Sequence, residues 1–126
     1  MNTIDDLERK LDQLLEEPDD AQLFNDIGVL LYLVKDQKNA ELYFQKAYEL
    51  NPINRDILYN YASLLHLQCH WRKAVTIYQD YLKLYPDDRE VAEKLGDCYY
   101  QLGGYDQAAK VYEQLSKMQK GEYIVL

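Results

Sequence analysis

Apolar residues along this chain recur at the spacing of short amphipathic helices. Within residues 21–54 they return every three or four positions, first at Phe24, Ile27 and Leu31 and then at Ala40 and Phe44. The arrangement returns twice, so we predict three helix pairs, over residues 21–54, 55–88 and 89–120. A separate apolar stripe predicts one further helix over residues 3–17, beginning at Thr3 as its cap.

Four kinds of residue keep one common spacing of 34 positions. They are the prolines Pro18, Pro52 and Pro86, the small residues Gly28, Ala62 and Gly96, the alanines Ala40, Ala74 and Ala108, and the aromatics Phe44, Tyr78 and Tyr112. Because these chemistries are unrelated, their shared period indicates a repeated structural unit. A glycine inside a helix costs about 1 kcal/mol relative to alanine, so Gly28 and Gly96 predict a close approach of two helix backbones.

With this pattern the sequence resembles the tetratricopeptide repeat (TPR) family. The three repeats carry Phe24, Ile27-Gly28, Leu31, Ala40, Phe44 and Pro52; Leu58, Tyr61-Ala62, Leu65, Ala74, Tyr78 and Pro86; and Ala92, Leu95-Gly96, Tyr99, Ala108 and Tyr112, with Lys120 in the place of the last proline. The resemblance covers residues 21 to 120 and implies an all-α fold, a right-handed α-solenoid forming a single domain over residues 1–126. It implies a non-catalytic scaffold that binds another protein.

The two ends of the repeat array call for separate interpretations. Residues 3–17 are expected to form a cap on the first repeat, and a dimerising coiled coil is the alternative, although two heptads are short for one. At the other end, the helix face of Val111, Leu115 and Met118 lacks a following repeat to cover it. We expect the apolar tail, residues 121–126, to cover part of this face or to dock on another copy of the chain; a disordered tail is the alternative.

Composition narrows the class of partner. The net charge is −8 and no basic stripe interrupts it, which argues against nucleic acid and anionic membranes as partners. Two cysteines, Cys69 and Cys98, build no disulfide framework, and no run approaches the roughly 18 apolar residues of a membrane span. We therefore expect a cytoplasmic protein. Tyrosine is abundant, with 13 residues, and suits half-buried or partner-facing positions.

Catalytic and metal-binding motifs are not evident. His66, Cys69 and His70 form the only cluster of metal-ligating residue types, but His70 falls in the predicted turn and no fourth ligand lies nearby in the sequence. The chain contains no glycine-rich phosphate loop, nucleophile elbow or zinc-protease motif. We predict neither an enzyme nor a bound metal or cofactor.

The resemblance places the first helix of each repeat along a concave groove. The residues expected to bind a partner there are Asn25, Val29, Tyr32, Leu33, Tyr59, Asn60, Ser63, His66, Leu67, Lys94, Asp97 and Tyr100. The tyrosines are amphipathic anchors, and an amide such as that of Asn60 can bond a peptide backbone at both ends. Five acids share the groove with one lysine, so a segment carrying basic as well as apolar residues is favoured.

Three functions fit these features. The first is an adaptor that captures an extended segment or short helix of a partner in the groove. The second is a small dedicated chaperone that shields an apolar client segment, similar to TPR chaperones of bacterial secretion systems. The third is a structural module that forms homo-oligomers through its C-terminal end.

Overall fold

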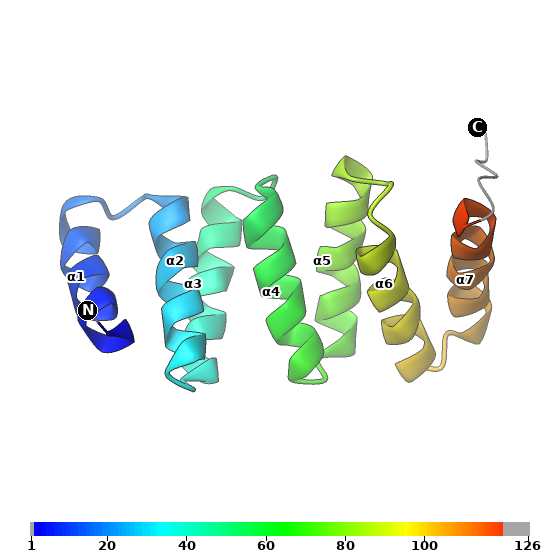
Figure 1. The fold of residues 1–126 in the computed structure, drawn as a ribbon, viewed down its shortest axis with the longest axis horizontal. Helices are drawn as coiled ribbons and strands as arrows, with labels where there is room; N and C mark the ends of the chain where they lie inside the picture. Colours follow the sequence, from blue (N-terminus) through cyan, green and yellow to red (C-terminus); the bar gives the residue numbers. More distant parts are fainter. Residues whose placement is uncertain (1, 120–126) are drawn as a thin grey trace.

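The protein is a single row of α-helices standing side by side. The computed structural model describes residues 2–119, and every element within that range is an α-helix. The helices are α1 (Thr3–Glu16), α2 (Ala21–Leu33), α3 (Gln37–Leu50), α4 (Arg55–Leu67), α5 (Trp71–Leu84), α6 (Arg89–Gln101) and α7 (Tyr105–Gln119). Each helix runs antiparallel to the one before it and packs mainly against its neighbours in the chain (Figure 1). The predicted all-α solenoid is confirmed.

Side-chain caps fix where the first helix of each pair begins. The caps are Asp20, Asn54 and Asp88, whose side-chain oxygens accept hydrogen bonds from the backbone N–H of Leu23, Ile57 and Val91 at 3.1, 3.1 and 3.2 Å. Such a cap contributes about 1 kcal/mol, because it satisfies an N–H group that has no partner within the helix. The caps lie 34 residues apart, so the starts of α2, α4 and α6 repeat with the sequence period.

The turns inside the helix pairs also repeat. Lys35, Cys69 and Gly103 adopt left-handed φ angles of 68°, 59° and 80°. In each turn the next residue donates its N–H back to a carbonyl in the last turn of the preceding helix, at 2.8–2.9 Å. Only glycine adopts this conformation without strain, so Lys35 and Cys69 adopt it at some cost in stability.

Helix α1 covers the first pair. Its side chains Leu7, Leu11 and Leu14 are partly buried against the core, and α1 packs on α2, as the cap interpretation predicts. The predicted capping residue is wrong by one position: Thr3 is the first helical residue, and Asn2 accepts the hydrogen bond from the Asp5 N–H at 2.9 Å. Both residue types cap helices well, and asparagine is slightly preferred, so the sequence alone did not separate them.

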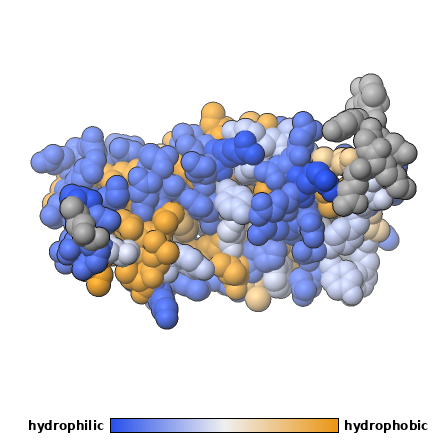
Figure 2. Space-filling model, viewed as in Figure 1, coloured by the Kyte–Doolittle hydropathy of each residue, from blue (hydrophilic) through white to orange (hydrophobic). Residues whose placement is uncertain are grey.

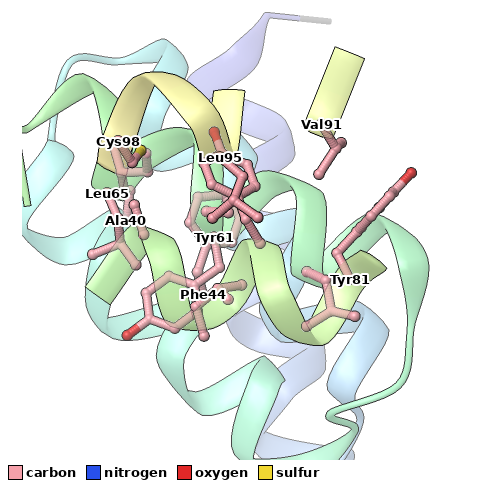
Figure 3. Packing of buried hydrophobic residues seen from close by; sticks show 14 of the residues in the cluster. Ala40, Phe44, Tyr61, Leu65, Tyr81, Val91, Leu95 and Cys98 are labelled. Atoms are coloured by element: carbon pink, nitrogen blue, oxygen red, sulfur yellow. The ribbon is translucent and has the colours of Figure 1, made fainter. Parts of the chain in front are cut away.

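The interior is a continuous strip of side chains from successive helices. Figure 3 shows Phe44 of α3, Tyr61 of α4 and Leu95 of α6 pointing into the same interior. A side-chain carbon added to Gly28 would lie 2.6 Å from the Phe44 ring, and one added to Gly96 would lie 2.9 Å from the Tyr112 ring. The expectation of two closely approaching backbones is therefore wrong in detail: each glycine makes room for an aromatic ring of the following helix.

The last helix is less completely covered than the others. Among residues 105–118 only Ala108 is buried, and Val111, Leu115 and Met118 are half-exposed. The predictions for residues 121–126, and the role of Lys120, concern residues that lie outside the described range.

Candidate functional site

A hollow of about 430 Å³ opens on the face formed by the first helices of the pairs. Its lining comes from α2, α3, α4 and α6, and consists of Val29, Tyr32, Phe44, Tyr59, Asn60, Ser63, Leu64, His66, Leu67 and Lys94. Eight of these ten residues are among the twelve predicted to bind a partner. A volume of this size accommodates several side chains of a bound segment.

Chemistry changes across the width of this groove. Because α2, α4 and α6 run in the same direction, their C-terminal halves share one edge, where Tyr32, Leu33 and Leu67 are exposed by 39%, 59% and 61%. Acidic residues occupy earlier turns of the same helices, at Asp26, Asp56, Glu90 and Glu93. Figure 2 shows hydrophobic residues gathered over the lower part of α2, with mainly hydrophilic residues above them. The groove therefore has an apolar edge and an acidic edge.

Two asparagines connect the first and second pairs beneath the groove. The Asn60 side-chain amide donates a hydrogen bond to the Asn25 side-chain oxygen over 3.1 Å. Asn25 is only 3% exposed, so the prediction that it faces a partner is wrong. Because this bond uses one amide hydrogen of Asn60, the other hydrogen and the carbonyl oxygen remain available for a ligand. Asn25 thus orients Asn60.

The groove lysine is partly compensated. Lys94 Nζ lies 3.8 Å from a Glu90 carboxylate oxygen and 6.0 Å from the centre of the Tyr59 ring. The Tyr59 hydroxyl donates to the same Glu90 oxygen over 2.8 Å. These contacts hold Tyr59 between α4 and α6, with its ring on the wall of the hollow. A second groove acid, Asp26, lies 3.8 Å from Lys10 Nζ of α1. The net charge of the groove stays negative, because two lysines face five acids, Asp26, Asp56, Glu90, Glu93 and Asp97.

His66 is fixed by an aromatic cluster behind the hollow. Its Nδ1 lies 3.0 Å from the Tyr78 hydroxyl, and its ring meets the Trp71 ring edge-on at 5.3 Å. Burial lowers the pKa of His66 below its ordinary value, and the nearby Lys94 lowers it further while Asp97 opposes them. Burial raises the pKa of Tyr78, so its hydroxyl keeps a proton that it can donate to Nδ1. His66 is therefore neutral near pH 7 and part of a fixed wall.

Both cysteines and His70 are absent from the lining of the hollow, although Cys98 Sγ lies 3.7 Å from His66 Nδ1 behind it. Cys69 is exposed in its turn, and His70 Nδ1 lies 3.4 Å from a Glu41 carboxylate oxygen. Cys98 is buried, and burial raises the pKa of its thiol to about 11, which leaves it protonated. Within residues 2–119 no group of three or more His, Cys, Asp or Glu side chains is placed to hold a metal ion. No helix in that range is both long and apolar enough to cross a membrane.

Three other predicted residues lie beside the hollow and do not line it. Leu33 is exposed on the apolar edge, and Tyr100 is 57% exposed with its ring 5.2 Å from that of Tyr105. Asp97 accepts a hydrogen bond of 2.5 Å from the Tyr112 hydroxyl of α7, because the two side chains face each other within the third pair.

Sequence reasoning missed two lining residues, Phe44 and Leu64. Phe44 was identified only as a repeat marker, and Leu64 was not assigned. Both are nearly buried, with Phe44 3% and Leu64 2% exposed, so only a small part of each reaches the hollow. The signal for Phe44 was present in Gly28, whose missing side chain lets the ring reach the floor of the hollow.

Residues 34–123 match the family described as anaphase-promoting complex, cyclosome, subunit 3. Human protein O-mannosyl-transferase TMTC3 is 34% identical over 79 residues, which are 63% of this chain and 9% of that protein. This chain thus spans about a tenth of the length of the curated relative that it matches.

Solved structures agree on the fold. A structure of MamA superposes with a TM-score of 0.83 at 20% identity, covering 94% of this chain and 64% of MamA. The crystal structure of YrrB, described as a TPR protein with an unusual peptide-binding site, has a TM-score of 0.70 at 19% identity. That superposition covers 80% of this chain and 52% of YrrB. At these identities the likeness shows the fold alone.

Proposed function

Because this chain belongs to the TPR-type family described as anaphase-promoting complex, cyclosome, subunit 3, we propose that it is a non-catalytic scaffold that binds a segment of another protein in the groove of α2, α4 and α6. The family identifies the repeat and the type of module. A TPR-type fold generally serves protein interaction, since a curved row of helices offers a long surface and encloses no reaction chamber.

The divided groove carries this proposal. The hollow is lined by apolar and aromatic side chains, among them Val29, Tyr32 and Leu67, and acids occupy the opposite edge of the same face. An amphipathic segment lying across the three helices would bury its apolar side chains in the hollow and present basic side chains to the acids. The free groups of Asn60 would bond its polar atoms.

The YrrB description supports a peptide-sized ligand by analogy, since that TPR protein is said to have a peptide-binding site. TMTC3 lends no support for transferase activity, because the matched residues are 9% of that protein. A cytoplasmic location stays a prediction.

The test is a selection of binding peptides from a random peptide display library. Selected peptides are expected to combine apolar residues with lysine or arginine and to bind at about micromolar dissociation constants. The Leu67→Glu variant places a carboxylate in the hollow and is expected to weaken these peptides at least about tenfold, equivalent to about 1.4 kcal/mol. Ile53→Glu is the matched control, because Ile53 is 65% exposed, close to the 61% of Leu67, and lies outside the groove.

Equal binding by both variants would move the site away from the groove. Selection of acidic peptides would contradict the charge argument. A client that stays soluble only in a stable one-to-one complex would favour the dedicated chaperone over the adaptor.

A further inference from the structure

A second hollow, of about 230 Å³, lies at the far end of the row. Its lining comes from α5, the α5–α6 turn, α6 and α7, and consists of Leu82, Pro86, Ala92, Leu95, Val111, Gln114, Leu115 and Met118. All but Gln114 are apolar. Within residues 2–119, α7 packs mainly against α6, and the hollow lies between α7 and α5.

The repeat register shows how the lining of this hollow differs from the corresponding place one repeat earlier. At five of its seven apolar lining positions, the residue 34 positions earlier is larger: Tyr48, Leu58, Tyr61, Ile77 and Tyr81 stand where Leu82, Ala92, Leu95, Val111 and Leu115 stand here. At the other two, Pro52 matches Pro86 and Leu84 matches Met118. In that earlier place Leu58, Ile77 and Tyr81 are at most 5% exposed. The hollow that remains there, of about 270 Å³, is lined by Tyr48, Tyr61 and Ile77 together with four polar or charged residues, Gln45, Glu49, Lys73 and Thr76, whereas the far-end hollow has only Gln114 as a polar lining residue. The Tyr48 hydroxyl also bonds Asp80 there, over 2.6 Å.

The backbone of the repeat unit is therefore the same in both places, whereas the side chains that line its interior differ in size. Five reductions in side-chain size at one interior place leave room for bulky apolar groups from elsewhere. Burial of apolar surface contributes about 25 cal/mol of stabilisation per Å², so an apolar occupant of the hollow is favoured.

We propose that this hollow is the docking site for residues 123–126 of the same chain, which read Tyr-Ile-Val-Leu. Four consecutive apolar side chains match the apolar lining. Met118 itself forms part of the rim, and five residue steps separate it from residue 123, a reach of at most about 18 Å. Gly121 lies within this connection and lets the chain reverse direction at low cost.

The tether favours this occupant over a separate molecule. A short connection gives the segment an effective concentration in the millimolar range at the hollow. A separate chain would first have to offset about 4–15 kcal/mol of lost translational and rotational freedom, and a hollow of this size buries too few groups to do so. Docking would complete the interior of the third pair with side chains that α6 and α7 lack.

The experiment is a double-mutant cycle on the full chain, measured by thermal unfolding at several protein concentrations. One variant replaces Ile124, Val125 and Leu126 with serine. A second, Ala92→Leu, restores the residue type of Leu58 and fills the hollow. The serine substitutions are expected to lower the unfolding midpoint of the unmodified chain by about 3–6 °C. In the Ala92→Leu background the same substitutions are expected to lower the midpoint by less than half as much. Ile53→Ser is the surface control, with an unchanged midpoint.

Three results would overturn the proposal. The first is an unchanged unfolding midpoint in the serine variant. The second is an equal fall of the midpoint with and without Ala92→Leu. The third is a fall of the midpoint that grows with protein concentration while sedimentation shows a dimer, which would assign the hollow to a second copy. Methyl NOEs between Val125 or Leu126 and Leu115 or Met118 in the unmodified chain test the same contact if Ala92→Leu does not fold. Random-coil shifts for residues 123–126 would contradict it. None of these variants touches the groove, so the outcome is independent of peptide binding.

Discussion

The second and third helix pairs begin alike but differ in how many side chains they bury. Both first helices start behind an acid or amide cap, and both inner turns contain a left-handed residue. Yet α5 buries Ala74, Ile77, Tyr78 and Tyr81, whereas Ala108 alone is buried in residues 105–118 of α7. A few marker positions thus set the path of the backbone. How completely each pair is buried depends on the side-chain volume at the other positions and on a following helix, which α5 has in α6 and α7 lacks within residues 2–119.

The largest expected effect comes from removing volume in the more completely buried second pair. Leu58 is fully buried, so Leu58→Ala is expected to lower the free energy of unfolding by about 2–5 kcal/mol. Leu115→Ala, at a half-exposed position of the third pair, is expected to cost less than about 1.5 kcal/mol. Urea unfolding of both variants makes the comparison. Equal losses would show that the two pairs are equally well packed.

The next effect concerns a polar contact that the third pair does not repeat. The Tyr81 hydroxyl donates to Asp88 over 2.5 Å and accepts from Arg55 Nε over 2.8 Å, and leucine stands at the matching position 115. Tyr81→Phe is expected to cost about 1–2 kcal/mol in the free energy of unfolding.

The same bonds act on Asp88. Burial alone would raise the pKa of this carboxyl, but hydrogen bonds from Tyr81, the Val91 N–H and Arg55 bring it below its ordinary value. Tyr81→Phe should therefore raise the Asp88 pKa, measurable by NMR titration. Tyr105→Phe, at a ring 62% exposed, is the control and should leave stability and this pKa within error. An unchanged Asp88 pKa in Tyr81→Phe would contradict the assignment.

A smaller effect distinguishes the turns. Cys69 holds a left-handed φ of 59° in the second pair, and Gly103 holds 80° in the third. Cys69→Gly is expected to raise the free energy of unfolding by about 0.5–1 kcal/mol, because glycine removes the strain, and Gly103→Ala to lower it by about 1 kcal/mol. Thermal unfolding measures both. The same sign for the two changes would refute the strain argument.

The smallest effect is a pH dependence carried by the second pair. Position 66 is histidine there and tyrosine at 32 and 100. The folded state lowers the pKa of His66, whereas the unfolded chain keeps the ordinary histidine pKa of about 6.5. As the pH falls through this value, the unfolded chain therefore binds a proton more readily than the folded chain does. Stability should therefore fall as the pH falls from about 7 to about 5, and His66→Gln should flatten this slope. An unchanged slope in the variant would remove His66 as the cause.

Much of the fold could be predicted from the sequence, because its determinants are local. The period, the caps and the proline positions act within a few residues, so they located the helix pairs. Details that depend on how side chains fill the space between helices were harder to predict. Gly28 was correctly identified as a close contact, but the group that approaches it, the Phe44 ring, depends on how α3 is rotated against α2.

The candidate groove shows the same division. The resemblance placed Val29, Tyr59 and Leu67 on one face, and the structure gathers them around one hollow. The burial of Asn25 was not predictable from spacing, because it depends on the hydrogen bond from Asn60, which is 35 residues away and belongs to the next repeat.

The row of helices has a consequence for the kinetics of folding. Almost every contact joins a helix to the next one along the chain, so the mean sequence separation of contacting residues is small. Chains of this low contact order fold quickly, on a timescale of about microseconds to milliseconds, and a nucleus can form at any helix pair and spread in both directions. The more completely buried second pair is then the place where folding is expected to start, and α7 is expected to join last.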